Sequence, residues 1–390
     1  MPDRDAVIVD AVRTPVGRAG GELGTVHAVD LAAHVIAGIV ERTGIDPATV
    51  DDVLLGCVDQ VGEQSLNVAR TAALAAGLPE SVPAATVDRQ CGSSQQAVHF
   101  AAQGILAGAY DVAVVGGVES MSRVPMFANT PDFAAAYGPR FRERYGLGPT
   151  DFINQGTSGE IVAERWDLSR DEMDAYAVES HHRAEAARAG GRFDDEILPI
   201  TADGEDGPHE VARDQGIRPA SSVEALAKLN PVFRDDGRLT AGNSSQLSDG
   251  AAALLVMDAA RARDLGLRPI ARVHTLTLAA VDPVTMLTAP IPATRRALER
   301  AGLAASDIDL YECNEAFACV PLAWHRELGI DLDRVNVNGG AIALGHPLGA
   351  SGARIMTTLL HEMRRRGSRY GLQTMCEGGG MANATILELL

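Results

Sequence analysis

The chain has 390 residues, of which 46% are hydrophobic and 22% charged, a composition typical of a globular protein with two or more domains. Its net charge of −18 argues against general binding to nucleic acid or to anionic membranes. The start of the chain lacks the layout of a signal peptide, and its apolar runs are too short for a membrane span. The five cysteines are therefore expected to be reduced thiols in the cytoplasm. Lys228 is the only lysine and no glycine-rich loop precedes it, which excludes a P-loop.

The first part of the chain alternates between strand and helix patterns. Residues 5–12 predict a buried strand, and Asp30 predicts the N-cap of a helix that continues to about Arg42. The alternation continues with a strand at 53–58, a helix at 67–76 and a strand at 112–117. This order predicts a layered α/β fold with a largely parallel or mixed sheet.

Cys91 lies in a turn of small residues, after a short strand pattern that ends near Asp88 and before a helical pattern that contains Ala97 and Ile105. This order predicts Cys91 at or just before a helix N-terminus. Free backbone N–H groups at that end favour a thiolate, so we expect a lowered pKa and a reactive nucleophile. The alternative interpretation is a buried structural cysteine, which is the common role of a free thiol.

The pattern changes between Glu119 and about Asn243, where strand-like runs become rare and helices are predicted at 159–166 and 170–189. We interpret residues 119–243 as an inserted loop domain. Its arginines form a local anion site or lie on a solvated surface; they are Arg183, Arg188, Arg192, Arg213 and Arg218.

The last part of the chain repeats the first. The segment 44–57 has a partner in 302–313, and the turn at Cys91 is echoed by the glycine-rich segment 345–352. Such internal similarity predicts two similar halves. The domain boundaries that follow are an N-terminal half of residues 1–118 plus 244–268, the loop domain 119–243, and a C-terminal half of residues 269–390.

Further candidate catalytic groups lie in the second half. Asn314 follows a strand pattern, His346 lies in a turn before a helix, and Cys376 ends a strand pattern just before Gly378. These residues supply a base, a second thiol for proton transfer and N–H donors for an oxyanion. Each one taken singly has a structural interpretation, as a turn histidine, a core cysteine or a glycine turn. Their shared position after strands, in the half that mirrors the Cys91 half, favours catalysis.

Over nearly its whole length the chain resembles the thiolase family. The resemblance rests on blocks in the right order, namely Arg13–Gly17, Cys91–Ser93, Gly116–Ser122, Thr240–Asn243, Asp249–Ala252, Asn314–Phe317, Gly339–Gly352 and Cys376–Gly380. It implies the thiolase fold, an α/β fold of two similar halves in αβαβα layers with an inserted loop domain that binds CoA.

The resemblance implies cleavage of a 3-oxoacyl-CoA by CoA through an acyl-cysteine, in fatty-acid or steroid side-chain β-oxidation. Cys91 would be acylated, His346 would activate it, and Cys376 would protonate the departing acetyl-CoA carbanion. Asn314, holding a water, would form one oxyanion hole together with His346. The N–H groups of Cys91 and Gly378 would form the other.

The resemblance further implies that Arg218 and Ser245 contact CoA, which is a substrate. It implies no metal and no permanently bound cofactor, and a homodimer or homotetramer. Cys57, Cys313 and Cys319 are assigned to packing.

Two positions depart from the family pattern. Short-chain acetoacetyl-CoA thiolases usually carry a His-Met pair where this chain has Asn154–Gln155, which favours medium-length or bulky 3-oxoacyl groups. Glu377 replaces a usual apolar residue; its side chain should point away from Cys376 along a strand, so we assign it no catalytic role. The turn 88–96 resembles that of degradative thiolases of actinobacteria.

Other functions fit the sequence less well. A short-chain acetyl-CoA acetyltransferase that makes acetoacetyl-CoA is one alternative, and a non-catalytic acyl- or sterol-binding relative is another. The second should have lost Cys91 or His346, and both are present. Decarboxylating ketosynthases and hydroxymethylglutaryl-CoA synthases lack a second catalytic cysteine in this glycine context. The sequence therefore favours a degradative thiolase.

Overall fold

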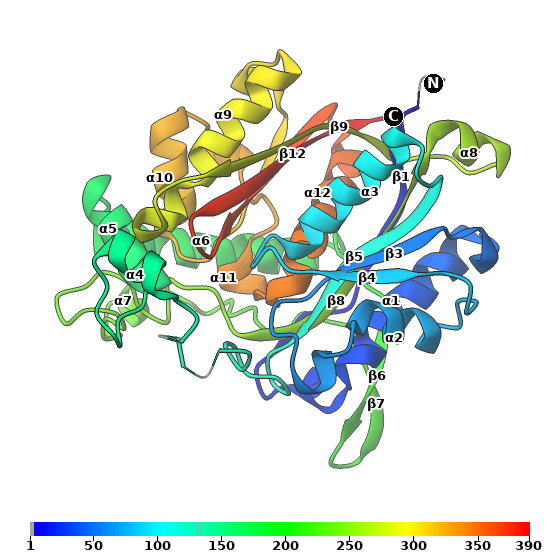
Figure 1. The fold of residues 1–390 in the computed structure, drawn as a ribbon. Helices are drawn as coiled ribbons and strands as arrows, with labels where there is room; N and C mark the ends of the chain where they lie inside the picture. Colours follow the sequence, from blue (N-terminus) through cyan, green and yellow to red (C-terminus); the bar gives the residue numbers. More distant parts are fainter. Residues whose placement is uncertain (1–3, 131, 134) are drawn as a thin grey trace.

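The computed structural model describes residues 4–130, 132–133 and 135–390 (Figure 1). One mixed sheet contains the main strands in the order β10-β11-β12-β9-β1-β8-β5-β3-β4. Their bounds are β1 (Ala6–Arg13), β3 (Asp52–Gly56), β4 (Ala84–Val87), β5 (Val112–Ser120), β8 (Ser248–Asp258), β9 (Ala271–Ala280), β10 (Leu310–Cys313), β11 (Tyr370–Glu377) and β12 (Met381–Leu389). The short β2 (Gly17–Arg18) also pairs with β8.

The N-terminal strands carry two helices on their outer face, α1 (Ala28–Thr43) and α2 (Val68–Ala75). Apolar residues spaced three and four apart give α1 one buried face, which packs into the core beneath it. The predicted N-cap Asp30 is wrong by three residues. His27 caps the helix, because its Nδ1 accepts the Val29 N–H at 3.2 Å, and Asp30 lies in the first turn.

The C-terminal strands carry α9 (Pro290–Ala301) and α10 (Cys319–Leu328) on their outer face. Trp324 of α10 is fully buried there, and its Nε1 donates to Thr294 Oγ1 at 2.9 Å. The two halves of the sheet join through a short pairing, in which Val7 and Ile8 of β1 lie opposite Arg272 and Ala271 of β9.

Two equivalent helices, α3 (Ser93–Ala107) and α12 (Ser351–Arg366), pack against each other between the two groups of strands (Figure 1). The outer helices, the N-terminal strands, α3 with α12, the C-terminal strands and the opposite outer helices form five layers. This confirms the predicted αβαβα arrangement. It also brings the N-terminal ends of α3 and α12 together, and each half contributes the turn that precedes its helix.

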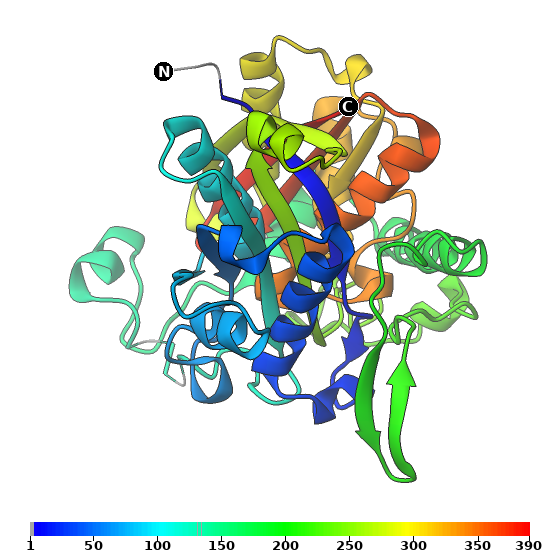
Figure 2. The same ribbon diagram turned by 90° about the vertical axis from the view of Figure 1, so that its right-hand side faces the viewer.

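The segment between β5 and β8 contains α4 (Pro139–Tyr145), α5 (Gln155–Arg165), α6 (Arg170–Ala189), α7 (Val223–Leu226) and a hairpin of β6 (Ile200–Gly204) and β7 (Gly207–Val211). Helix α6 has the predicted bounds, whereas α5 begins four residues before the predicted start. Asn154 caps it there, since its Oδ1 accepts the Gly156 N–H at 2.7 Å. The hairpin was not predicted, because its strands are short and largely polar; it projects away from the layers (Figure 2).

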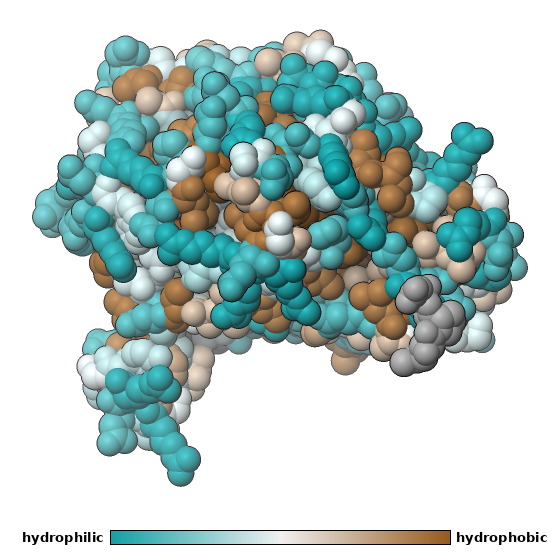
Figure 3. All heavy atoms as spheres, turned by 90° about the horizontal axis from the view of Figure 1, so that it is seen from above, coloured by the Kyte–Doolittle hydropathy of each residue, from teal (hydrophilic) through white to brown (hydrophobic). Residues whose placement is uncertain are grey.

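Two short helices complete the fold, α8 (Ala259–Asp264) after β8 and α11 (Ala341–Leu344) before α12. On the face seen in Figure 3, hydrophilic side chains interrupt the apolar ones, which form separate patches. Among the described residues, none of the helices has both the length and the apolar character needed to cross a membrane.

Candidate active site

Cys91 lies in the turn between β4 and α3, two residues before the first residue of that helix. Ser93 closes the turn, because its Oγ accepts the Arg89 N–H at 2.9 Å and donates to the Gln90 carbonyl at 2.5 Å. Gln90 has a φ of +49°, a left-handed conformation that costs a non-glycine residue about 1–2 kcal/mol. The predicted position of Cys91 at a helix N-terminus is confirmed.

The protonation state of Cys91 differs from our expectation. The side chain is 6% exposed and packs among apolar residues, which are Val58, Met121, Leu348, Ile355 and Met375. Burial, followed by the nearby Cys376 and Glu377, raises the pKa of Cys91 well above its ordinary value. The predicted lowering of this pKa is wrong, because the loss of water outweighs the favourable helix N-terminus. The thiol is neutral and needs a base.

His346 lies in the turn between α11 and α12, next to the nucleophile turn, because Leu348 packs in the same cluster as Cys91. Gly345 precedes it with a φ of +107°, and a Cβ there would lie 2.3 Å from Ser248 Oγ. The His346 N–H donates to the Gln246 carbonyl and to Ser248 Oγ, each at 3.1 Å. The Gln246 carbonyl and the Ser248 hydroxyl, at the start of β8, therefore fix the position of the His346 backbone.

The hydrogen bonds of His346 select one tautomer. Ser351 Oγ donates to the Pro347 carbonyl at 2.8 Å, so it accepts from His346 Nδ1–H at 2.6 Å. Nε2 is then unprotonated, and Asn314 Nδ2 lies 3.4 Å from it as a donor. Burial, followed by the charge of Arg354, lowers the pKa of His346 to about 3. The imidazole is neutral, and the Nε2 lone pair, which the Asn314 amide faces, is the position on the ring that can accept a proton.

Asn314 follows β10, and its amide lies between His346 and the second thiol. It donates toward His346 Nε2, and its side chain also hydrogen-bonds to Cys376. Burial raises the pKa of Cys376 to about 12, although hydrogen bonds from Asn314 and from the Ala316 N–H act in the opposite direction. Asn314 Oδ1 is buried without a partner among the described residues. An ordered water commonly satisfies such an atom.

Gly378 follows β11 and runs beside the nucleophile turn. A Cβ at this position would lie 2.9 Å from Gln90 Oε1, so its backbone approaches the residue that precedes Cys91. The structure thus brings together all five predicted catalytic residues, which are Cys91, Asn314, His346, Cys376 and Gly378. The arrangement combines two neutral thiols, a neutral imidazole and polar N–H donors in a buried space.

The two predicted CoA contacts, Arg218 and Ser245, lie beside the segments that hold His346 and Asn314. Arg218 is exposed, and its Nη2 donates to Gln246 Oε1 at 3.3 Å. The Ser245 N–H donates to the Ala316 carbonyl at 3.0 Å. Both residues therefore touch the segments that hold His346 and Asn314, and the exposed Arg218 carries a positive charge.

Sequence reasoning missed the residues that hold these groups in place, above all Glu315. Glu315 accepts hydrogen bonds from two residues of α6, from Tyr176 Oη at 3.0 Å and from Ser180 Oγ at 2.7 Å. It also accepts from Asn336 Nδ2 at 3.0 Å and from the Ile342 N–H at 3.1 Å. An acidic residue directly after Asn314, in an otherwise apolar segment, was a sequence signal that could have indicated this structural role.

The remaining cysteines agree with a packing role. Cys57, Cys313 and Cys319 are free and buried. Cys57 lies in the N-terminal core and the other two lie in the C-terminal core. Burial raises the pKa of all three thiols well above the ordinary value, as it does for Cys91, so their place in the apolar cores, and not their pKa, supports the packing role.

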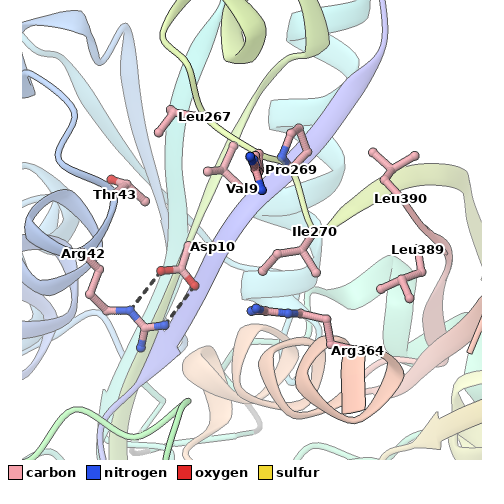
Figure 4. A pocket seen from close by; sticks show the side chains of 11 residues that line it. Val9, Asp10, Arg42, Thr43, Leu267, Pro269, Ile270, Arg364, Leu389 and Leu390 are labelled. Carbon is pink, nitrogen blue, oxygen red and sulfur yellow. Dashed lines mark hydrogen bonds and ion pairs between the residues drawn. The ribbon is translucent and has the colours of Figure 1, made fainter. Parts of the chain in front are cut away.

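A surface pocket elsewhere contains none of the predicted site residues (Figure 4). It lies where β1, α1 and α12 meet the end of β12, and its charged side chains are Asp10, Arg42, Arg268 and Arg364. Arg42 Nε donates to Asp10 Oδ2 at 3.0 Å, so this guanidinium is already paired.

Comparison with known proteins identifies the family. The family model described as "Thiolase, N-terminal domain" matches residues 6–260, and the model described as "Thiolase, C-terminal domain" matches residues 267–389. The chain belongs to the thiolase family. This thiolase is 52% identical to the steroid 3-ketoacyl-CoA thiolase FadA6 of Mycobacterium tuberculosis, over 99% of this chain and 94% of that protein.

Two further proteins have similar coverage. A 3-ketoacyl-CoA thiolase of Bacillus subtilis is 45% identical, over 99% of this chain and all (100%) of that one. The crystal structure of the Bacillus anthracis acetyl-CoA acetyltransferase has a TM-score of 0.91 and 41% identity, and it covers 99% of both chains. These relatives confirm both the thiolase fold and the assignment of the chain to the acyltransferases.

Proposed function

We propose that this thiolase acts in degradation and cleaves a 3-oxoacyl-CoA with CoA to give acetyl-CoA and a shortened acyl-CoA. The observation that carries the proposal is the convergence of two neutral thiols and a neutral imidazole around the Asn314 amide. The relatives named steroid 3-ketoacyl-CoA thiolase and 3-ketoacyl-CoA thiolase support the degradative direction.

The first bond forms between Cys91 Sγ and the 3-oxo carbon, and the thiol proton passes to His346 Nε2. Burial opposes a lone thiolate and a lone imidazolium, so the two charges form together and stabilise each other. The N–H groups of Cys91 and Gly378 receive the negative charge on the former 3-oxo oxygen. Each such donor contributes about 3 kcal/mol to the transition state.

The bond between carbons 2 and 3 then breaks, leaving Cys91 acylated and the electron pair on the acetyl-CoA enolate. Protonated His346, with a water held by Asn314, faces the enolate oxygen, and Cys376 gives its thiol proton to carbon 2. The high pKa of Cys376, about 12, suits a donor that must stay protonated until a strongly basic carbanion forms.

The incoming CoA thiol closes the cycle. The Cys376 thiolate takes its proton, the CoA sulfur attacks the acyl carbon, and Cys91 leaves with the proton that His346 holds. Arg218 and Ser245 contact the CoA during both half-reactions. Atoms and protons balance without a metal or a bound cofactor. Five free thiols suit a reducing compartment, and we propose the cytoplasm.

Steady-state thiolysis of 3-oxoacyl-CoAs, combined with alkylation by iodoacetamide, tests this function. The protein should release acetyl-CoA only when CoA is added, and iodoacetamide should abolish activity by modifying Cys91 first. Prior incubation with acyl-CoA should protect it. Full inactivation with the label on Cys57 or Cys313 would contradict the assignment of the nucleophile.

A second candidate function is the reverse synthesis of acetoacetyl-CoA by a short-chain acetyl-CoA acetyltransferase. The likeness to the Bacillus anthracis acetyl-CoA acetyltransferase favours it. The same catalytic groups serve both directions, so the acyl pocket decides between them. The pair Asn154–Gln155, in place of the short-chain His-Met pair, favours medium-length or bulky 3-oxoacyl groups over acetoacetyl-CoA.

A further inference from the structure

Glu377 is a buried carboxyl beside the nucleophile that the mechanism above leaves unused. It is the last residue of β11, between Cys376 and Gly378, and it is 0% exposed. Both of its carboxyl oxygens lack a hydrogen-bond partner among the described residues. An ionised carboxylate without partners in a protein interior is strongly unfavourable. The charge on this group therefore depends on its immediate surroundings.

The carboxyl lies directly against the backbone of the nucleophile turn. A Cβ at Gly92 would be 2.0 Å from Glu377 Oε1 and 2.9 Å from Asn383 Nδ2, so a residue larger than glycine would displace both side chains. Asn383 Nδ2 in turn donates to the Gly92 carbonyl at 3.1 Å. Gly92, Glu377 and Asn383 thus form one packed unit behind Cys91.

Charged and titratable groups face this carboxyl from two elements. The turn after β4 contributes Asp88, Arg89 and Cys91, and β11 contributes Cys376. Burial raises the pKa of Glu377 to about 8; the charge of Arg89 and the nearby backbone N–H of Asn383 oppose this rise, and Asp88 adds to it. In return, a charged Glu377 raises the pKa values of both Cys91 and Cys376.

We propose that Glu377 is a positioning residue whose carboxyl must be uncharged for Cys91 to react, so that its ionisation sets the alkaline limit of the reaction. A negative charge here would oppose both the Cys91 thiolate and an oxyanion bound to the N–H groups of Cys91 and Gly378. The charge of Arg89 lowers the pH at which Glu377 ionises. The inference rests on the proposed role of Cys91 as the nucleophile.

Alkylation of Cys91 by iodoacetamide, followed by peptide mass spectrometry across a range of pH, tests the proposal without requiring turnover. Glu377→Gln should match the wild type near pH 6.5. At about pH 9 it should react roughly tenfold faster, which corresponds to one unit in the pKa of Cys91. Glu312→Gln is the matched control, because Glu312 is a buried acid on the neighbouring β10 that faces Arg354; it should keep the wild-type curve.

A second variant tests the role of Arg89. Arg89→Gln removes the cation that lowers the pKa of Glu377. The pH at which the alkylation rate of Cys91 falls below that of Glu377→Gln should therefore move upward. Superimposable curves for wild type and Glu377→Gln would overturn the proposal. So would an equal loss of reactivity at every pH, which indicates a merely structural role.

Thiolysis separates this inference from the proposed function. kcat/KM of Glu377→Gln should decline less than that of the wild type between about pH 7 and pH 9. If no variant catalyses thiolysis but the alkylation curves differ as described, the proposed function fails and the role of Glu377 stands. If thiolysis occurs and the alkylation curves coincide, the proposed function stands and the role of Glu377 fails.

Discussion

Burial determines the charge of each candidate catalytic side chain. It raises the pKa values of Cys91 and Cys376 and lowers that of His346, because desolvation disfavours the charged form of either kind of group. All three are therefore neutral near neutral pH. The pair Ser351 and Pro347 then fixes which imidazole nitrogen is free.

Cys376→Ala separates the two tasks of the thiols. Overall thiolysis should be lost, because the acetyl α-carbon loses its proton donor and general acid–base catalysis contributes roughly 10²–10⁴-fold. Cys91 should still become acylated by an acyl-CoA donor, and intact-protein mass spectrometry would detect the added mass. Near-wild-type thiolysis by this variant would remove Cys376 from the mechanism.

Ser351→Ala tests the tautomer of His346. Without the hydroxyl that accepts from Nδ1–H, the imidazole loses its orientation, and kcat should fall at least roughly tenfold with little change in KM. Thr357→Val is the control, because that hydroxyl lies on the same helix and donates to the Ala353 carbonyl at 2.9 Å. If the two variants lose activity equally, Ser351 has no special role.

Glu315 joins helix α6 to the segments that carry Asn314 and His346, beside direct hydrogen bonds such as that from the Gly340 N–H to Ser180 Oγ at 3.1 Å. Glu315 receives hydrogen bonds from α6, from the loop before α11 and from α11 itself. The residue next to it in the chain is Asn314, and α11 leads into the turn of His346. The buried carboxyl group of Glu315 thus ties α6 to the segments that carry Asn314 and His346.

Glu315→Gln should weaken this connection. An amide has only one acceptor oxygen, and its NH₂ group would face donors, so buried donors lose partners at a cost of roughly 1–3 kcal/mol each. Urea unfolding should report the lower free energy of unfolding, and kcat should fall with it. Glu179→Gln, on the more exposed side of the same helix, should change neither quantity; equal effects of both variants would contradict the coupling.

For the molecule as a whole, β4 is one of the two end strands of the sheet; its residues are half-buried or exposed, whereas those of β10 at the other end are buried. Open strand edges invite pairing with a further strand, and β4 leads directly into the nucleophile turn. We propose that two copies pair through this edge, as dimers or within tetramers. Sedimentation velocity should give a dimer or tetramer, and a monomer at micromolar concentration would contradict this.

The preferred substrate is the other property of the whole molecule. We expect thiolysis of medium-length or bulky 3-oxoacyl-CoAs in preference to acetoacetyl-CoA. Each additional buried methylene contributes about 0.8 kcal/mol, so kcat/KM should rise visibly along a series of chain lengths and ring-bearing substrates. Values for acetoacetyl-CoA that equal or exceed the others would assign the enzyme to the short-chain group.

Local patterns in the sequence predicted the layered fold, the duplication and five candidate catalytic positions, which the structure brings together. Strand and helix periods and glycine-rich turns are local signals, and the repeat placed equivalent turns in both halves. Tertiary structure alone decided the protonation of Cys91, since burial is created by residues far apart in the chain. It also decided the contact of Glu377 with Gly92 and the network around Glu315. These join segments hundreds of residues apart, so no local pattern encodes their distances.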